Sequence, residues 1–343
     1  MPQMMKRWEM NEIGRNALKL HEVQVPEPGP GEVLVKVAAV ALNYRDKLVI
    51  EAGMGLPLEF PFTPGSDLAG TVVALGKNVS RVREGERVIA TFAPGWIEGA
   101  PLGDARTPPY RTLGGAYPGV LAEYVAFPED WLVKAPATLS DAEASTLPCA
   151  GLTAWTGLIE KGGLHAGETV LVEGTGGVAL FALQIAKAHG ARVIVVSGSA
   201  EKLKKAAALG VDHGIDRSAG DWVEAVLRIT GDHGVDHIVE LIGGLHLGKA
   251  VQAAAIGGKI YQIGVLEGFD VAAPVGPLML KNITIHGISV GHRKGLENLV
   301  AAVDSTGIKP VIDAYYPLGD LPKALDHLER GAFGKIVVDL ESR

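Results

Sequence analysis

The chain has 343 residues, which is enough for two domains, and 47% of them are hydrophobic while 21% are charged. These proportions, together with 45 glycines, are typical of a turn-rich α/β enzyme and exclude a largely disordered chain. The net charge of −7 and the lack of a basic face argue against nucleic acid as a partner.

Cysteine content and hydropathy indicate the compartment. Cys149 is the only cysteine, which rules out an internal disulfide and fits a reducing environment. The N-terminal residues form no apolar run long enough for a signal peptide, and no segment approaches the roughly 20 apolar residues of a membrane span. We therefore expect a soluble, cytoplasmic protein that does not interact with a membrane.

The first part of the chain is expected to be rich in β-structure. Apolar residues flanked by glycine and proline predict strands at 33–37, 70–76, 87–90 and 121–125. The loop 93–117 is rich in Gly and Pro, and loops of this length are usually functional or mobile.

From about Asp141 the apolar residues recur with a helical period, and strands then alternate with helices. The alternating segments are 168–173, 177–189, 191–196, 200–209, 221–230, 235–242, 247–254 and 258–264. This alternation predicts an α/β fold with a doubly wound parallel sheet, covered by helices on both faces. A further strand is expected at 283–290. The tail should form a helix at 321–330 and a strand at 335–340, and return to the β-rich domain.

The most specific motif is a glycine-rich turn between a strand and the following helix. It consists of Gly174, Thr175, Gly176, Gly177, Val178 and Ala179. Gly174 permits a tight turn, Gly176 lets the backbone approach a pyrophosphate, and the small Ala179 keeps helix and strand close. The pyrophosphate would rest on the N–H groups that begin the helix, where the dipole favours negative charge. Because strands lie on both sides of this turn–helix segment, the sequence predicts a dinucleotide-binding site.

The end of the second strand indicates which dinucleotide binds. NAD sites usually carry an acid there, whereas this chain has Ser197 and Ser199. Lys202 lies one turn further on, and Arg217 ends the next short element. Hydroxyl groups and cations satisfy the oxygen atoms and the charge of a 2′-phosphate, so we expect these four residues to bind NADP(H). The alternative for the two cations is an ordinary solvated surface.

Several segments together resemble the medium-chain dehydrogenase/reductase superfamily over essentially the whole chain. They are 28–33, 65–70, 147–154, 257–260 and 333–337. The resemblance implies a GroES-like catalytic domain at 1–137 and 292–343, and a Rossmann NADP-binding domain at 138–291. It also implies a homodimer, because the strand expected at 283–290 matches one that extends the sheet across subunits in this superfamily.

Zinc-dependent members of the superfamily hold a catalytic metal with a Cys, a His and a second Cys or Asp. Asn43 and Ser66 match the first two positions and Cys149 matches the third, while Asp67 matches an acid that sometimes ligates or supports the metal. Asn and Ser are poor zinc ligands, and a catalytic site needs about three protein donors. We therefore expect no zinc. The chain is similar to the zinc-independent branch, with quinone oxidoreductases, enoyl reductases and an alcohol-dehydrogenase-like subgroup.

Without a metal, hydride transfer is easiest to an electron-poor acceptor, because the developing oxyanion then needs only hydrogen bonds and a proton. We expect NADP(H)-dependent reduction of a quinone or an α,β-unsaturated carbonyl compound. Asn43, which would also lie beside the cofactor, could donate its amide N–H to the substrate, and Tyr44 could supply the proton. Asp67 could support Asn43, a backbone N–H or a ribose hydroxyl. Simpler interpretations are a turn residue, a half-buried aromatic and a structural acid, respectively.

Two other functions stay open. The protein could be an alcohol dehydrogenase that uses Tyr44 or Asp67 as a base, or a metal held weakly by Asp67 and Cys149. It could instead be a sensor or structural protein that binds NADPH without turnover.

The remaining candidate residues lie in loops and at strand ends. Trp96 and Tyr110 either line the substrate pocket or anchor the long loop. By resemblance, Thr153 lies near the nicotinamide. The segment Ile263-Gly264-Val265 ends a strand, so its backbone could face the nicotinamide as well. The histidines scattered through the nucleotide-binding domain lack metal-ligand spacing, and no role is expected for them. They are His189, His213, His233, His237 and His246.

Overall fold

A computed structural model of the protein describes residues 2–101, 103–108 and 110–341. The chain divides into two compact units, one formed by Met1–Leu152 with Gly291–Arg343 and the other by Thr153–Val290. Among the described residues, no helix combines the length and apolar character needed to cross a bilayer.

The second unit is built on a six-stranded sheet in which all neighbouring strands are parallel. In spatial order the strands are β10 (His213–Asp216), β9 (Arg192–Ser197), β8 (Thr169–Glu173), β11 (Val235–Glu240), β12 (Ala254–Gln262) and β13 (Thr284–Gly287). The chain runs from β8 to β9 on one side, and later returns to place β11 on the other side of β8. This makes the carboxyl ends of β8 and β11 the switch point of the sheet, where ligands bind in open α/β folds.

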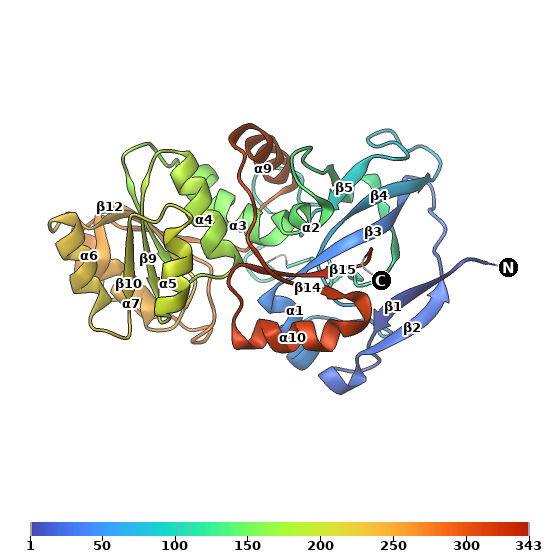
Figure 1. Cartoon of the computed structure of the whole chain (residues 1–343), viewed down its shortest axis with the longest axis horizontal. Coiled ribbons are helices and arrows are strands. Elements are labelled where there is room, and N and C mark those ends of the chain that lie inside the picture. The colour runs from blue at the N-terminus through green and yellow to red at the C-terminus, as the bar shows by residue number, and fades with distance from the viewer. Residues whose placement is uncertain (1, 102, 109, 342–343) are drawn as a thin grey trace. The chain divides into compact units, whose positions relative to one another are not determined.

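Helices cover both faces of this sheet. Figure 1 shows two of them on one face, α4 (Gly177–Ala188) and α5 (Ala200–Ala207), and two on the other, α6 (Trp222–Thr230) and α7 (His246–Ala253). Because both faces are covered, β8 is buried over its whole length. A further helix, α8 (Val275–Leu280), precedes β13.

The first unit contains a mostly antiparallel sheet and a separate hairpin. The sheet order is β14 (Ile312–Pro317), β15 (Lys335–Asp339), β3 (Glu32–Leu42), β4 (Asp67–Leu75), β5 (Arg87–Ala90) and β7 (Leu132–Lys134), and β6 (Tyr124–Pro128) pairs with β3. Only β14 and β15 are parallel among these pairs. The hairpin consists of β1 (Met4–Glu9) and β2 (Lys19–Gln24). The eleven-residue β3 is the centre of the unit, since it pairs with β15, β4 and β6 and is buried at nearly every position.

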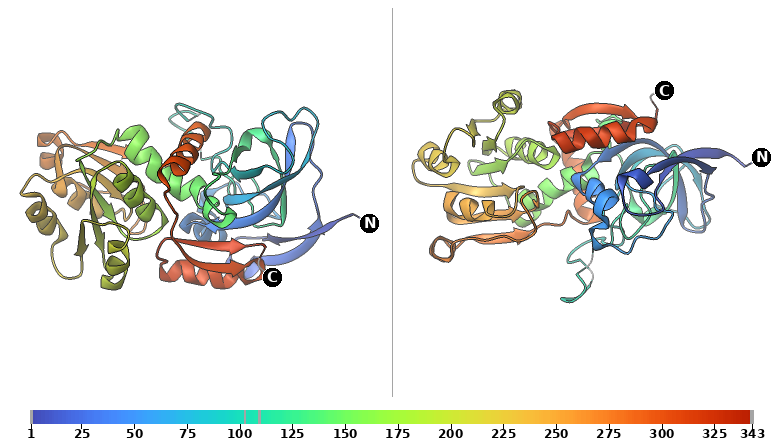
Figure 2. Two further views of the ribbon diagram at one scale, coloured as in Figure 1. Left: turned by 45° about the horizontal axis from the view of Figure 1, so that its top comes forward. Right: turned by 90° about the horizontal axis from the view of Figure 1, so that it is seen from below.

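Helices pack around this β-structure. The longer ones are α1 (Tyr44–Ala52), α9 (Arg293–Thr306) and α10 (Leu321–Arg330), and α2 (Asp141–Ala144) is short, while α3 (Leu152–Trp155) has only its first residue in this unit. Figure 2 shows α10 lying along β14 and β15, against which it buries Leu321, Ala324 and Leu325. The unit also contains short turns, namely Arg15–Ala17, Gly53–Gly55, Glu129–Trp131 and Leu318–Asp320 as 3₁₀ turns and Leu147–Gly151 as a π turn; a second π turn, Thr156–Lys161, belongs to the second unit.

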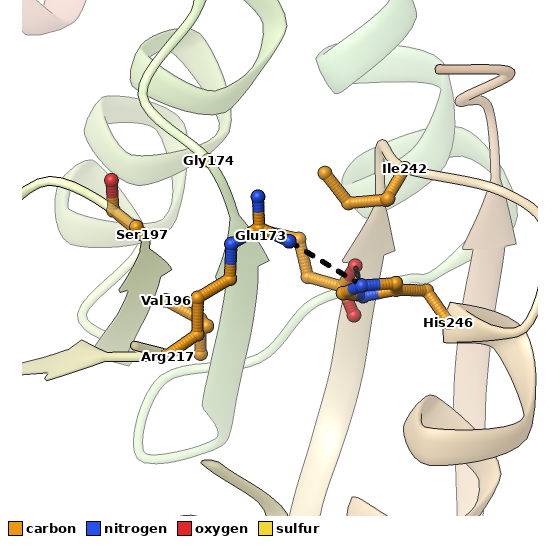
Figure 3. Close-up of a pocket in the computed structure, with 8 residues that line it drawn as sticks. Glu173, Gly174, Val196, Ser197, Arg217, Ile242 and His246 are labelled. Atoms are coloured by element: carbon orange, nitrogen blue, oxygen red, sulfur yellow. Dashed lines mark hydrogen bonds and ion pairs between the residues drawn. The ribbon is translucent and has the colours of Figure 1, made fainter. Parts of the chain in front are cut away.

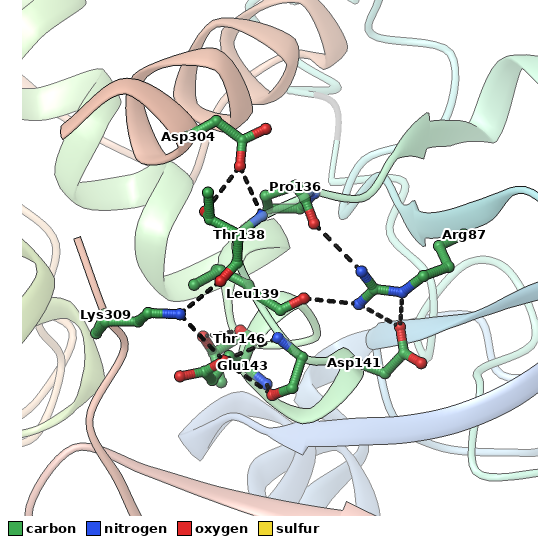
Figure 4. Close-up of polar contacts among 10 residues, drawn as sticks. Arg87, Pro136, Thr138, Leu139, Asp141, Glu143, Thr146, Asp304 and Lys309 are labelled. Atoms are coloured by element: carbon green, nitrogen blue, oxygen red, sulfur yellow. Dashed lines mark hydrogen bonds and ion pairs between the residues drawn. The ribbon is translucent and has the colours of Figure 1, made fainter. Parts of the chain in front are cut away.

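A polar network fixes the segment that leads into α2 (Figure 4). The Arg87 side chain donates to Asp141 Oδ1 at 2.8 Å and to the Leu139 carbonyl oxygen at 2.9 Å. Asp304, from α9, accepts from the backbone N–H and the hydroxyl of Thr138 at 2.9 and 2.7 Å. These contacts tie three separate parts of the first unit together, close to the turns that carry Cys149.

The sequence-based expectations for the parallel sheet and its alternating helices are confirmed. Several strand predictions differ in their bounds: 33–37 extends to Glu32–Leu42, 70–76 begins at Asp67, 121–125 begins only at Tyr124, 258–264 begins at Ala254, and 283–290 shrinks to Thr284–Gly287. The last ends early because the chain leaves the sheet before Val290, whose φ is 136°. The helix α1 was not expected, since its apolar residues show no helical period and its capping box, Asn43 with Asp46, was not recognised.

Candidate functional site

The glycine-rich turn joins β8 to α4 as the motif predicts. Gly174 has φ 93°, a left-handed conformation that favours glycine, and its N–H donates to the Val196 carbonyl oxygen on β9 at 2.7 Å. Gly176 is the N-cap of α4, Gly177 is its first residue and Val178 its second. Ala179 is buried between helix and sheet, whereas Thr175 is buried in the turn. The start of this twelve-residue helix therefore presents backbone N–H groups as an anion site requires.

The predicted 2′-phosphate residues gather at the next strand end. Ser197 closes β9 and its hydroxyl accepts from the Ser199 N–H at 3.2 Å, while Ser199 caps α5 by accepting from the Lys202 N–H at 3.3 Å. Arg217 follows β10, and its N–H donates to the Ser197 carbonyl oxygen at 3.0 Å. The structure thus brings all four predicted residues to the carboxyl ends of β9 and β10.

A cavity of about 110 Å³ opens at these strand ends (Figure 3). Its lining is formed by Glu173, Gly174, Val196, Ser197, Gly198, Arg217, Ile242 and His246. Two apolar residues flank the cavity around Glu173. Val196 is the last residue but one of β9, and Ile242 follows β11, and these two strands lie on either side of β8. The cavity therefore lies at the switch point of the sheet, where the dinucleotide site was expected.

Two ionisable residues of this lining, Glu173 and His246, were missed by the sequence analysis, as were Val196, Gly198 and Ile242. Glu173 is only 2% exposed, and burial raises the pKa of its carboxyl to about 7, with His246 opposing and Glu240 adding to the rise. His246, which was dismissed with the other histidines, lies with Nδ1 3.4 Å from Glu173 Oε2. Hydrogen bonding to Glu173 raises the pKa of this imidazole. No local signal marks His246, because it enters the cavity from a helix far along the chain.

The strand end predicted to face the nicotinamide is held by a buried acid. Glu240 accepts from the N–H groups of Ile242 and Gly243, each at 2.8 Å, and its carbonyl oxygen accepts from the Ile263 and Gly264 N–H groups, each at 3.0 Å. A Cβ at Gly264 would lie 1.8 Å from the Leu241 carbonyl carbon, so only glycine fits there.

Thr153 and Val265 occupy different environments within this unit. Thr153 is 3% exposed in α3, and Val265 follows Gly264 on a loop beyond β12.

The residues that match zinc-ligand positions form a hydrogen-bonded chain in the first unit. The Lys335 ammonium, 4% exposed, donates to Asn43 Oδ1 and to the Leu42 carbonyl oxygen, both at 2.6 Å. Because an ammonium only donates, Asn43 must turn its oxygen toward Lys335 and its nitrogen toward Ser66 Oγ, which lies 3.2 Å away. The orientation of the Asn43 amide is therefore determined by its neighbours.

Asp67 ends this chain and is completely buried. Its Oδ1 accepts from the Ser66 hydroxyl at 2.7 Å, and its Oδ2 accepts from the Cys149 backbone N–H at 3.0 Å. Burial raises the pKa of Asp67 to about 6, against the lowering effect of Lys335. Burial and the Asp67 charge also raise the pKa of the Cys149 thiol, so this cysteine is not an activated nucleophile. Lys335 lies within the family-like segment 333–337, but the sequence analysis did not predict its contact with Asn43.

The neighbouring residues of α1 have different surroundings. Asp46 accepts from the Asn43 N–H at 2.8 Å, and Arg45 lies 3.6 Å from Asp46 Oδ1. Arg45 also lies over the rings of Phe92 and Tyr110, 5.3 and 5.7 Å from the ring centroids. Tyr110 is thus packed as part of a loop-anchoring cluster.

The other two aromatic candidates lie apart from that cluster. Tyr44, the first residue of α1, is 40% exposed, so its hydroxyl group is on an accessible side chain next to Asn43. Trp96 donates from Nε1 to the Gly99 carbonyl oxygen at 2.9 Å and meets the His292 ring edge-on, with 5.7 Å between centroids. Trp96 and Tyr110 are therefore each held by their own contacts. Among the described residues, no three His, Cys, Asp or Glu side chains are grouped to hold a metal ion.

Comparisons with known proteins agree with this architecture. Residues 29–137 match the alcohol dehydrogenase GroES-like domain, and residues 177–305 match the domain described as zinc-binding dehydrogenase. A zinc-type alcohol dehydrogenase-like protein of Schizosaccharomyces pombe is 36% identical over 337 residues, with 96% of each chain covered. The human quinone oxidoreductase is 27% identical, covering 95% of this chain and 94% of its own.

Solved structures are similar over the same length. A crystal structure of a candidate alcohol dehydrogenase from Sinorhizobium meliloti 1021 is 59% identical, with a TM-score of 0.97, and the match covers 99% of this chain and 100% of that chain. The structure of an NAD-dependent alcohol dehydrogenase is 34% identical, with a TM-score of 0.87 and coverage of 98% and 100%.

Fold, glycine-rich turn and relatives together define an oxidoreductase that uses a nicotinamide cofactor. The chain belongs to the medium-chain dehydrogenase/reductase superfamily, with a GroES-like domain and a Rossmann domain.

Proposed function

We propose that the protein is a zinc-independent, NADP(H)-dependent oxidoreductase that reduces a quinone or an α,β-unsaturated carbonyl compound. The observation that carries this proposal is the hydrogen-bonded chain from Lys335 through Asn43 and Ser66 to Asp67. In this proposal the GroES-like residues 1–137 and 292–343 bind the substrate, and residues 138–291 bind the cofactor. A cytoplasmic location stays a prediction from the single cysteine.

The donor set in the first unit does not fit zinc. The Asn43 oxygen accepts from a buried ammonium, and the Ser66 hydroxyl is engaged between Asn43 and Asp67. A zinc ligand from cysteine must be a thiolate, yet the pKa of Cys149 is raised by burial. Placing a divalent cation there would also bring it beside the positive charge of Lys335. We therefore derive no catalytic step through a metal.

The second unit supports NADP(H) over NAD(H). Ser197 and Ser199 stand where an acid would hold the 2′-hydroxyl group of NAD, and Arg217 lies beside them. A guanidinium and two hydroxyl groups provide charge and donors for a 2′-phosphate. The NAD-dependent relative leaves NAD(H) as the competing cofactor, so the ratio of the two affinities is the direct test.

The bound cofactor would supply the hydride, and residues of the first unit would handle the substrate. The Asn43 amide donates to Ser66 and also interacts with Asp67, and in this proposal a substrate carbonyl oxygen would take one of its two N–H groups. Tyr44 is adjacent and accessible, so its hydroxyl group is our proposed proton donor. Lys335 fixes the amide, which lets the donor face the oxyanion without reorganisation.

One observation favours alcohol oxidation as a second candidate. Asp67, whose pKa is raised to about 6, is ionised at neutral pH and sufficiently basic to accept a proton. Its two oxygens are already occupied by Ser66 and Cys149, so we place it second.

A homodimer is proposed from an apolar surface on the second unit. Exposed apolar side chains lie on and near α8 and the edge strand β13, namely Leu266, Phe269, Val275, Met279, Leu280 and Ile285. An unpaired strand edge beside a patch of this kind fits pairing with a second copy, which would continue the sheet.

The test is to follow NADPH oxidation with a panel of quinones and enones, using untreated and chelator-treated protein. Chelator-resistant turnover supports the proposed function and ranks the acceptors. Turnover only with NADP⁺ and alcohols would favour the second candidate. Cofactor binding without turnover on any acceptor would indicate a non-catalytic NADPH-binding protein.

A further inference from the structure

Arg217 is held over the strand ends by its surroundings rather than extending freely from the surface. Its backbone N–H donates to the Ser197 carbonyl oxygen, and its guanidinium crosses the cavity toward His246 on α7 (Figure 3). A Cβ at residue 198 would lie 3.1 Å from Arg217 Nε. Gly198 therefore leaves the space through which the arginine side chain passes.

His246 is the residue that meets the guanidinium. Its Nε2 lies 3.5 Å from Arg217 Nη1 and 3.5 Å from Glu267 Oε1, and its Nδ1 faces Glu173 Oε2 at 3.4 Å. The ring is stacked on Trp222, with 6.3 Å between centroids and 18° between planes. The two ring nitrogens face different partners, so the position of the ring proton decides which partner each nitrogen can hydrogen-bond.

Glu173 determines that tautomer. The carboxyl is 2% exposed and interacts with His246, whose Nδ1 lies 3.4 Å from Oε2, and with the neighbouring acid Glu240. A proton on Nδ1, facing Glu173, leaves the Nε2 lone pair facing outward. Since a guanidinium only donates, this is the tautomer that accepts from Arg217.

We propose that His246 and Glu173 are positioning residues that hold the Arg217 guanidinium for the 2′-phosphate of the cofactor, and so set the preference for NADP(H) over NAD(H). The proposal rests on the proposed use of NADP(H). Only the neutral form of the imidazole can accept from the guanidinium, so the contact is made at a pH above the raised pKa of His246. Glu267, whose carboxylate lies 3.9 Å from Arg217 Nη1, competes for the same group from the exposed side.

The experiment measures the dissociation constants of NADPH and NADH by cofactor fluorescence, for the wild type and a set of variants. The readout is the ratio of the two constants, because damage to the fold or to shared contacts weakens both cofactors alike. We expect Arg217→Ala to reduce the NADPH preference about tenfold or more, as loss of a charge-assisted hydrogen bond does. His246→Leu should reduce it about fivefold, while His246→Gln, which keeps an acceptor, should largely restore it.

A double-mutant cycle tests whether His246 acts through Arg217. The ratio for Arg217→Ala with His246→Leu should equal that for Arg217→Ala alone. Likewise, Glu173→Gln should lower the ratio in the wild type and leave it unchanged in His246→Leu. His233→Gln is the matched control, since this histidine is 67% exposed and contacts Asp236 at a distant turn, and it should leave the ratio unchanged.

The outcomes separate the two proposals. If Arg217→Ala lowers the NADPH preference but His246→Leu does not, the positioning role is wrong and NADP(H) use stands. Additive losses in the double variant would also overturn the positioning role. If the wild type binds both cofactors equally and Arg217→Ala changes neither constant, the proposed use of NADP(H) is wrong.

Discussion

Lys335 Nζ donates to Asn43 Oδ1 at 2.6 Å. Asn43 occupies the position at which zinc-dependent relatives are expected to carry a metal ligand. The positive charge beside Asn43 is therefore that of the Lys335 ammonium, which is buried together with the carboxyl groups of Asp46 and Asp67. Removing it would leave the Asn43 oxygen without its donor and Asp67 without the cation that lowers its pKa, whereas Asp46 would keep Arg45 beside it.

We therefore expect Lys335→Met to lower the free energy of unfolding by about 3 kcal/mol, the scale of losing one partner of a buried polar network. Urea denaturation would measure this. Lys323→Met is the matched control, because this lysine is 71% exposed and pairs only with Asp320 at the surface, so its loss should cost less than about 0.5 kcal/mol. Equal losses in the two variants would contradict the buried role of Lys335.

Tyr44→Phe tests the proposed proton donor. The variant keeps the ring and removes one hydroxyl group from an exposed side chain, so the fold should be unaffected. We expect kcat to fall about a hundredfold, as when a general acid is removed, with an unchanged Kd for NADPH. Stopped-flow measurement of the hydride-transfer step would check this. An unchanged kcat would exclude Tyr44 as the donor.

The raised pKa of Glu173 predicts how the free energy of unfolding depends on pH. Its pKa is about 7 when folded and 4.5 in its ordinary state, so between these values the folded protein binds more protons than the unfolded one. Stability from this group therefore falls as the pH rises from about 5 to 8, by up to roughly 3 kcal/mol. The raised pKa of His246 acts in the same direction, since its stabilising charge is lost as the pH rises through the folded value. Glu173→Gln should flatten the profile measured by urea denaturation, and an equally steep profile would contradict the assignment.

The apolar surface at α8 predicts an effect on assembly. Leu280 is 83% exposed and Met279 is 68% exposed, which is unfavourable unless a partner covers them. We expect a dimer by light scattering and a monomer for Leu280→Glu, because a buried carboxylate opposes association. Ile13→Glu serves as a control at an apolar side chain that is 49% exposed in the first unit. A monomeric wild type would contradict the proposed dimer.

Local patterns predicted the parts of the site that are contiguous in sequence. The turn from Gly174 to Val178 and the acid-free end of β9 follow from strand periodicity and glycine spacing, and both lie where the motif places them. Lys335 could not be found in this way, because it meets Asn43 across 292 positions of sequence. His246 was equally hidden, since a histidine on a helix has no local mark of what it faces. The α1 helix was missed because its apolar residues lack a helical period, so caps and tertiary packing rather than a local pattern stabilise it.

The central claim is that this donor set works without zinc, and the most direct test is the zinc content of active protein. Zinc per chain would be measured by inductively coupled plasma mass spectrometry on the same sample whose NADPH-dependent kcat is determined. We predict full activity with far less than one zinc per chain, before and after chelation. One zinc per chain that is lost together with activity on chelation, and restored with it, would contradict the account.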